Sequence, residues 1–170
     1  MTPLSNLAPM LLLLLLGVDL AAAQTATAAA AVPTLVPGWS FIRAVAAPNF
    51  HSYLQAQPTG VPGDAHLGAP DQAGQFQLSD GQLVYSTGEG ADEAPLYLHS
   101  TENTYGTFGF QGDTLIWSTP ELQRPNNAAW LVCDGDEKLV YVNTGAYGYE
   151  TPAGCADQTI HGYTGSTPDR

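Results

Sequence analysis

The chain has 170 residues, of which 16 are acidic and 4 are Lys or Arg, and its formal net charge is −12. Such an acidic surface repels phosphate backbones and anionic lipid headgroups, which argues against nucleic acid or a membrane as a partner. The length leaves room for one domain with a substantial hydrophobic core, but not for two. The sequence leaves the oligomeric state open.

The first two dozen residues have the pattern of a signal peptide. A leucine run, Leu11 to Leu16, is followed by Ala21-Ala22-Ala23, whose small side chains fit the A-x-A cleavage pattern. The apolar stretch between Asn6 and Asp19 is too short to cross a hydrocarbon core of about 30 Å. We therefore predict that residues 1–23 are removed on export and that the protein is secreted, either extracellular or in a cell wall.

The rest of the chain divides by composition into three parts. Residues 24–37 are rich in Ala, Thr and Pro, and they are expected to form a linker. Residues 38–164 carry the strand-like patterns and are predicted to form a single β domain. Residues 165–170 have the composition of a disordered tail.

Cys133 and Cys155 are the only cysteines of the chain, so one intramolecular pairing is possible. An oxidising compartment makes a disulfide the expected state of such a pair. A reactive thiol would need a nearby cation or a C-x-x-C arrangement, and the sequence shows neither. We predict a disulfide between these two residues.

The predicted domain has a hydrophobic period of two, with turn residues every eight to twelve positions, which is typical of an all-β fold. The strongest hairpin turns at Asp80-Gly81, which can supply the positive φ angles of a two-residue type I′ turn. Pairing across this turn sets Phe76 opposite Tyr85 and Leu78 opposite Leu83. All four side chains then share one face, which specifies the register.

A second segment repeats this hairpin at a constant offset of 32 residues, so that Phe108 faces Trp117 and Phe110 faces Leu115. A third hairpin is predicted around the turn at 134–138. Three such units suggest closure into a small barrel of the β-trefoil type. The alternative is a two-sheet antiparallel β-sandwich, which the uneven spacing of the units favours. Further strands are predicted at residues 40–46, 52–57 and 96–99.

Three stretches carry a resemblance to a known group of proteins: Gly74–Leu83, Trp130–Cys133 and Val142–His161. Together they resemble small secreted proteins of filamentous fungi and, more distantly, phialide-associated cell wall proteins and the C-terminal domains of Pir-type wall mannoproteins. The resemblance covers residues 39–163 and implies an extracellular or wall-associated, non-enzymatic role. The chain lacks the repeat region and the four-cysteine pattern of the Pir type, so that route of covalent wall attachment is not expected.

Motifs for catalysis or metal binding are absent from the sequence. The four histidines have no zinc-ligand spacing, and the acidic turn at 134–137 lacks the order of an EF-hand loop. No G-x-S-x-G elbow occurs, and the acids available for glycoside hydrolysis, such as Glu150 and Asp157, lie in no recognisable motif. We therefore predict no catalytic residues, no metal and no cofactor, with a glycan-active hydrolase as the less favoured alternative.

The remaining indication of function in the sequence is a group of aromatic residues. Tyr147, Tyr149 and Glu150 lie in a glycine-rich loop that precedes Cys155, and exposed tyrosines beside polar groups can stack on sugar rings. Packing of both tyrosines beneath the loop is an equally good interpretation. The predicted function is a secreted, non-enzymatic fungal cell-wall or surface-associated protein that binds wall polysaccharide through this loop. The alternative is a secreted effector that binds a host or competitor protein.

Overall fold

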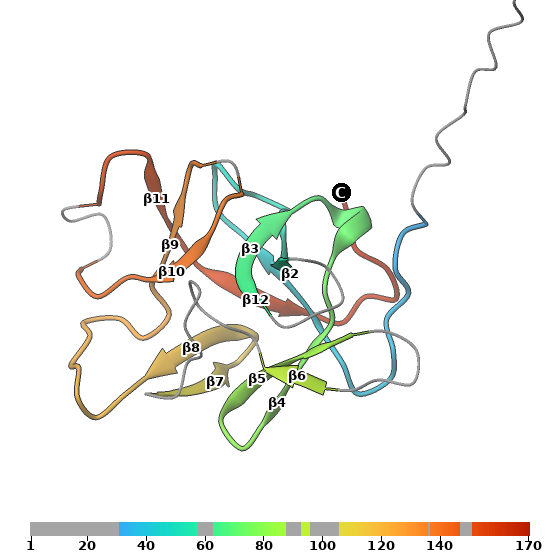
Figure 1. Ribbon diagram of the computed structural model, residues 1–170, viewed down its shortest axis with the longest axis horizontal. Helices are drawn as coiled ribbons and strands as arrows, with labels where there is room; N and C mark the ends of the chain where they lie inside the picture. Colours follow the sequence, from blue (N-terminus) through green and yellow to red (C-terminus); the bar gives the residue numbers. More distant parts are fainter. Residues whose placement is uncertain (1–30, 58–62, 88–92, 96–105, 136, 147–150) are drawn as a thin grey trace, which may run out of the picture.

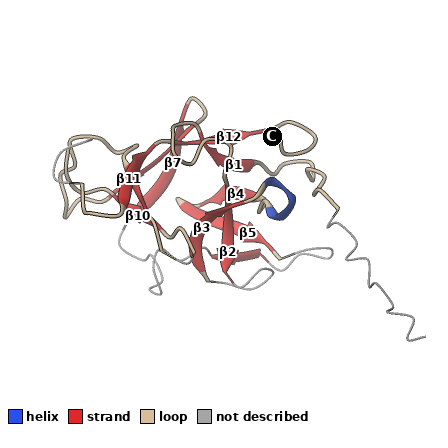
Figure 2. Ribbon diagram, turned by 90° about the horizontal axis from the view of Figure 1, so that it is seen from above, coloured by secondary structure: helices blue, strands red, loops and turns tan. Residues whose placement is uncertain are grey.

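The computed structural model describes residues 31–57, 63–87, 93–95, 106–135, 137–146 and 151–170. Every pairing between the strands in these ranges is antiparallel. Their only helical element is a single 3₁₀ turn, η1 (Pro70–Gln72). The predicted all-β class is therefore confirmed (Figures 1 and 2).

Six strands form the largest sheet, in the order β3-β2-β1-β12-β8-β7. These strands are β1 (Phe41–Ala44), β2 (Tyr53–Gln57), β3 (Asp64–Gly68), β7 (Thr107–Gln111), β8 (Thr114–Ser118) and β12 (Ile160–Tyr163). Strands β1 and β12 come from opposite ends of the domain and pair along their full length, with Phe41 opposite Tyr163 and Ala44 opposite Ile160. This pairing brings the two ends of the domain together in the middle of the sheet.

Two smaller sheets complete the fold. One has the order β4-β5-β6 and contains β4 (Phe76–Ser79), β5 (Gln82–Ser86) and β6 (Glu93–Pro95); the other has the order β10-β9-β11 and contains β9 (Trp130–Cys133), β10 (Val140–Val142) and β11 (Cys155–Gln158). Backbone hydrogen bonds join both to the large sheet. The amide of Phe108 donates to the carbonyl of Gly81 at 2.7 Å, and that of Leu67 donates to Lys138 at 3.1 Å.

The predicted hairpin registers are confirmed. Phe76 lies opposite Tyr85 and Leu78 opposite Leu83, while the turn residues Asp80 and Gly81 have φ angles of 49° and 77°. Leu78 is nevertheless 37% exposed, because it lies near the tip of the hairpin, beyond the core. The second hairpin also has the predicted pairs, with Phe108 opposite Trp117 and Phe110 opposite Leu115.

The predicted closed, β-trefoil-like barrel is not observed. Each of the three hairpins has its own third strand: β6 pairs with β4–β5, β12 with β7–β8, and β11 with β9–β10. Because these third strands differ in origin, the repeat in the sequence does not produce a single closed ring. The sheets remain open, and β3 and β7 form the two edges of the largest one.

One hydrophobic core serves all three sheets. Its fully buried side chains include Ile42 and Leu54 of the large sheet, Leu83 of the second sheet, and Trp130 and Val132 of the third. The indole N–H of Trp130 donates to the carbonyl of Leu115 at 3.1 Å, which satisfies the one polar atom that this large side chain brings into the core. Trp117 and Trp130 are both buried, whereas Trp39, which precedes β1, is only partly buried.

The described part of the expected linker, residues 31–37, and the expected disordered tail both contact the domain. The amide of Leu35 donates to the carbonyl of Ser166 at 2.9 Å, and that of Val36 donates to Gln75 Oε1 at 2.7 Å. Pro168 is buried. Residues 165–170 therefore pack against the domain. The local composition does not reveal this packing, because the residues that they contact are far away in the sequence. The strand predicted at 96–99 lies outside the described residues.

Candidate functional site

Cross-strand register assembles a row of polar side chains on the large sheet. Arg43 of β1 lies opposite both Tyr53 of β2 and His161 of β12, and His161 in turn lies opposite Thr114 of β8. Directly opposed residues of antiparallel strands share a face. We call Tyr53, Arg43, His161 and Thr114 the outer-face row, because residues of the main core, such as Ile42 and Ile160, occupy the alternate positions. At one end of this face Tyr53 is itself fully buried, in a second and smaller cluster with Phe41 and Ala73. Four strands spaced about 4.8 Å apart give the row a span of about 14 Å.

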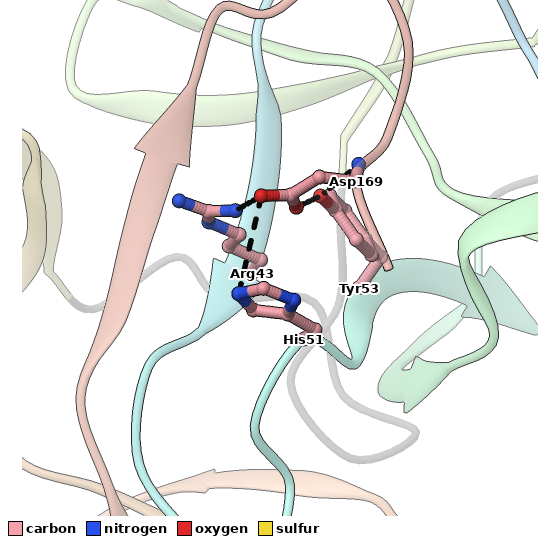
Figure 3. Close-up of polar contacts among 4 residues, drawn as sticks. All are labelled: Arg43, His51, Tyr53 and Asp169. Carbon is pink, nitrogen blue, oxygen red and sulfur yellow. Dashed lines mark hydrogen bonds and ion pairs between the residues drawn. The ribbon is translucent and has the colours of Figure 1, made fainter.

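Asp169 lies at the Tyr53 end of the outer-face row and contacts both Tyr53 and Arg43 (Figure 3). Arg43 Nη1 donates to Asp169 Oδ2, the Tyr53 hydroxyl donates to Asp169 Oδ1, and the backbone amide of Asp169 donates to the Tyr53 oxygen at 2.9 Å. His51 Nε2 lies 3.9 Å from Asp169 Oδ2. The segment after β12 is thereby fixed over β1 and β2 by three hydrogen bonds to one residue.

These contacts shift the protonation equilibria of the groups involved. The hydrogen bond from Arg43, more than any other contact, lowers the pKa of the Asp169 carboxyl below its ordinary value. Burial, and next the Asp169 carboxylate, raises the pKa of Tyr53 to about 12. The hydrogen bond to Asp169 also raises the pKa of Arg43. At neutral pH this end of the row therefore holds a carboxylate, a guanidinium and a neutral phenol.

Arg43 keeps part of its guanidinium available. The group lies over the ring of Tyr163, at 4.2 Å from the ring centre, and its side chain is 21% exposed. Its Nε is buried and finds no hydrogen-bond partner among the described residues. Figure 3 shows the second terminal nitrogen directed away from Asp169. Arg43 thus pairs with Asp169 through Nη1, while its buried Nε has no acceptor in the described part of the chain.

The opposite end of the row holds a second carboxylate. His161 Nδ1 lies 3.3 Å from Asp113 Oδ2, and His161 Nε2 lies 3.4 Å from the Thr114 hydroxyl. The hydrogen bond with His161 is the main cause that lowers the pKa of Asp113. A neighbouring cavity of about 240 Å³ is lined by Asp113 and by residues on either side of it in the fold: Ser40, Phe110, Gly112, Gly162 and Thr164. The carboxylate that contacts His161 therefore belongs to a residue of the cavity wall.

An exposed aromatic ring lies next to the Asp169 end of the row. Phe50 is 60% exposed, the highest value among the large hydrophobic side chains of the described residues. Its ring stacks on His51 with 4.0 Å between centres and 21° between planes. His51 has a φ of 58°, and the buried Asn49 accepts a hydrogen bond from Lys138 Nζ at 3.1 Å. This left-handed turn directs Phe50 outward while His51 points to Asp169.

The loop residues predicted to bind glycan, Tyr147, Tyr149 and Glu150, lie outside the described residues. The structure describes what flanks them along the chain. A cavity of about 420 Å³ is lined by Leu131, Asn143, Thr144, Gly145, Ala146, Thr151 and Pro152. Next to it, Asp157 accepts hydrogen bonds from the Asn143 amide and, at 2.7 Å, from the Thr151 hydroxyl. These contacts fix the orientation of the Asp157 carboxylate beside the cavity.

The predicted disulfide is present. Cys133 of β9 and Cys155 of β11 lie directly opposite each other and are joined through their sulfur atoms, and the described part of the chain has no free cysteine. In that same part, no group of three or more His, Cys, Asp or Glu side chains could hold a metal ion. None of its helical segments has the length and apolarity needed to cross a membrane.

Comparisons with known proteins gave no match to any family model, curated protein or solved structure.

Sequence reasoning missed Phe50, His51, Arg43 and Asp169 as site residues. Their contacts depend on sequence separations as long as the 126 residues between Arg43 and Asp169, which no local pattern encodes. One signal was available. Arg43 is one of only four Lys or Arg residues, and it alternates with apolar neighbours in a strand, which places it on the face opposite the core.

We expect Asp169→Asn to lower the free energy of unfolding by about 1 kcal/mol at pH 6, because the partly exposed carboxylate accepts charge-assisted hydrogen bonds. The folded-state pKa of Asp169 lies below its ordinary value of 3.8, so its contribution is present above that value and is lost as the pH falls through the folded-state pKa. Thermal unfolding followed by circular dichroism should therefore show a difference between the two proteins that is smaller at pH 2 than at pH 6. An equal difference at both pH values would contradict this account. The exposed Asp134→Asn is the matched control.

Proposed function

We propose that this protein is an exported, non-enzymatic β domain, associated with a fungal cell wall or surface, that binds polysaccharide on its outer-face row. The leucine-rich N-terminus and the disulfide between Cys133 and Cys155 support export. Open sheets around a shared core support a sandwich-like arrangement. On the outer face of the large sheet, the side chains of Arg43 and His161 are partly exposed.

The observation that carries this proposal is the position of Phe50. Carbohydrate sites combine an aromatic ring, which packs on the apolar face of a sugar, with polar groups that bond the hydroxyls. Phe50 is 60% exposed, and its stacking partner His51 lies 3.9 Å from Asp169. Arg43 and Asp169 supply a donor and an acceptor that are both partly exposed. An aromatic platform and hydrogen-bonding groups are thus contiguous.

Retention of the purified, oxidised protein on insoluble β-glucan and on chitin tests the proposal. We expect retention on at least one of the two polymers, and we expect Phe50→Ala to weaken it roughly three- to tenfold, because one stacking contact is lost. Leu122→Ala is the matched control, since Leu122 is also an exposed large apolar residue, at 37%, and lies after β8. Absence of retention on both polymers by the unmodified protein would contradict the proposal.

The same retention assay compares the two candidate binding sites, the loop predicted from the sequence and the outer-face row. Tyr147→Ala and Tyr149→Ala test the loop predicted from sequence, whereas Phe50→Ala tests the outer-face row. A loss of retention confined to the tyrosine variants would move the binding site to the loop and remove the outer-face row from the proposal.

A further inference from the structure

The cavity lined by Asp113, which we call the Asp113 cavity, has a volume of about 240 Å³. It lies where the turn between β7 and β8 meets the end of β12 and the residue before β1. Backbone hydrogen bonds join these segments. The amide of Gly162 donates to the carbonyl of Asp113 at 2.7 Å, and Ser40 exchanges two hydrogen bonds with Phe76, at 2.9 Å and 2.8 Å. The cavity is therefore formed by segments that the fold holds in place.

Two glycines keep the Asp113 cavity open. Gly112 has a φ of 66°, and a Cβ atom there would have nothing within 4 Å in the described part of the chain except its chain neighbours. A Cβ atom on Gly162 would lie 3.3 Å from Cε1 of Phe110, so a side chain at this position would crowd the ring. Phe110 and Gly162 are partly buried, while Gly112, Asp113 and Thr164 are exposed. The cavity thus has an aromatic ring on its inner side and a polar rim that solvent reaches.

The wall of the cavity offers three kinds of contact. Asp113 is a hydrogen-bond acceptor whose side chain is 70% exposed, and its contact with His161 uses Oδ2. A carboxylate can accept about four hydrogen bonds, so Asp113 keeps the capacity to accept one from a ligand N–H. The hydroxyls of Ser40 and Thr164 can donate hydrogen bonds. Phe110, which packs against the main core, supplies an apolar surface.

A ligand that binds through its charge is a poor match to these groups. An anion would be repelled by Asp113 and by the net charge of −12 on the whole chain. A cation would gain little, because ion pairs of exposed carboxylates are weak in water. Size is a further limit, since sites for whole small molecules have volumes of about 300–1,000 Å³. The cavity therefore suits one neutral substituent of a larger ligand, with an N–H donor, a carbonyl acceptor and an apolar end.

We infer that the Asp113 cavity takes the acetamido group of an N-acetylated hexosamine, so that the protein prefers chitin-type polysaccharide to glucan. This inference rests on the proposed function. The acetamido N–H donates to the Asp113 carboxylate, its carbonyl oxygen accepts from the Thr164 hydroxyl, and its methyl group packs on the ring of Phe110. Asp113 also contacts His161 of the outer-face row. The sugar that carries this group therefore lies next to the row, at the end opposite Asp169.

Calorimetric titration with three β-1,4-linked hexasaccharides tests the inference. Their sugars are N-acetylglucosamine, glucosamine and glucose, so they differ only in the substituent at the 2-position. The purified, oxidised protein is titrated at pH 6, where Asp113 is ionised. We expect the N-acetylglucosamine hexasaccharide to bind about tenfold more tightly than the glucose hexasaccharide, because the acetamido group adds hydrogen bonds and an apolar contact. This preference should persist in 0.5 M salt, since the acetamido group is neutral.

Variants of the cavity wall locate the acetamido group. Asp113→Ala and Phe110→Leu should each reduce the preference to less than about threefold, whereas Asp113→Asn should keep most of it, because an amide oxygen still accepts a hydrogen bond. Thr164 is exposed, so Thr164→Val removes a hydroxyl without disturbing the core, and it should lower the preference about threefold. Asp134→Ala is the matched control, since Asp134 is an exposed carboxylate that lines a separate cavity, and it should keep the full preference.

Equal affinity for the N-acetylglucosamine and glucose hexasaccharides would overturn the inference and leave the proposed function standing. Tighter binding of the glucosamine hexasaccharide that disappears in 0.5 M salt and in Asp113→Asn would replace the acetamido contact with an ion pair, and so contradict the inference. A full preference for N-acetylglucosamine in both Asp113→Ala and Phe110→Leu would exclude this cavity as the binding site of the acetamido group. Binding of none of the three, together with no retention on glucan or chitin, would overturn both the inference and the proposed function.

Discussion

Replacing both Cys133 and Cys155 with serine is expected to lower the free energy of unfolding by about 3 kcal/mol. The two residues are 22 positions apart, and the segment between them contains β10 and the turn that precedes it. In the chain-entropy model, the bond restricts the unfolded chain and so raises its free energy. A small domain has a total stability of about 5–15 kcal/mol, so the loss is a large part of the whole.

Urea unfolding followed by tryptophan fluorescence measures this effect. Trp130 is fully buried and lies in the β9–β11 pair that the disulfide joins, opposite Gln158, so a change in its emission reports on this sheet. The unmodified protein in a reducing agent is the matched control and should unfold at the same urea concentration as the double serine variant. A shift of less than about 1 kcal/mol in both would show that the β9–β11 pairing is stable without the disulfide.

The parts of the fold that the sequence predicts are those whose geometry is local. Asp80-Gly81 fixes the register of its hairpin because a two-residue turn with positive φ angles allows only one alignment of its strands. The second hairpin also turns over two residues, Gly112 and Asp113, of which Gly112 has a positive φ of 66°. The disulfide could also be predicted from the sequence, since Cys133 and Cys155 have no other intramolecular partner.

The parts that the sequence does not predict depend on pairing between distant segments. Strand β12 shows no hairpin signal of its own and finds its partner in β1, more than one hundred residues earlier. The expectation of a barrel failed for the same reason. The repeat specifies three hairpins but not which third strand each hairpin acquires, and β6, β11 and β12 come from different parts of the chain.

The candidate site follows from these distant pairings. Arg43 and His161 meet only because β1 and β12 are neighbours, and Asp169 reaches Arg43 only because the chain turns back after β12. A six-residue segment of polar and small residues gives no local sign of this contact, so composition predicted disorder for it. The aromatic loop of Tyr147 and Tyr149 stood out in the sequence because its features are contiguous. The residues of the outer-face row are scattered.

Arg124 was also not recognisable from the sequence, and it carries the second large expected effect. It follows β8 in the long connection to β9, half-buried, and lies over the ring of Trp117 at 5.7 Å. Its guanidinium donates to four backbone carbonyls: that of Asn143 at 2.9 Å, that of Trp117 at 2.6 Å, that of Asn127 at 3.2 Å, and that of Ala129. One side chain thus fastens the ends of β8 and β10 to the connection that leads into β9.

Arg124→Ala is expected to lower the free energy of unfolding by about 3 kcal/mol, because it removes four hydrogen bonds to carbonyls and the contact with Trp117. The carbonyls of Asn127 and Ala129 keep a backbone donor in the variant. Burial lowers the pKa of Arg124 to about 10, so the guanidinium is still charged at neutral pH and donates charge-assisted bonds. Arg124→Lys should lose most of the same stability, since an ammonium cannot reach carbonyls arranged around a planar fork. Urea unfolding at pH 7 measures both variants, with the exposed Arg170→Ala as the control, expected to stay within about 0.5 kcal/mol of the unmodified protein. If Arg124→Lys were as stable as the unmodified protein, the charge of Arg124 rather than its set of carbonyl contacts would account for its role.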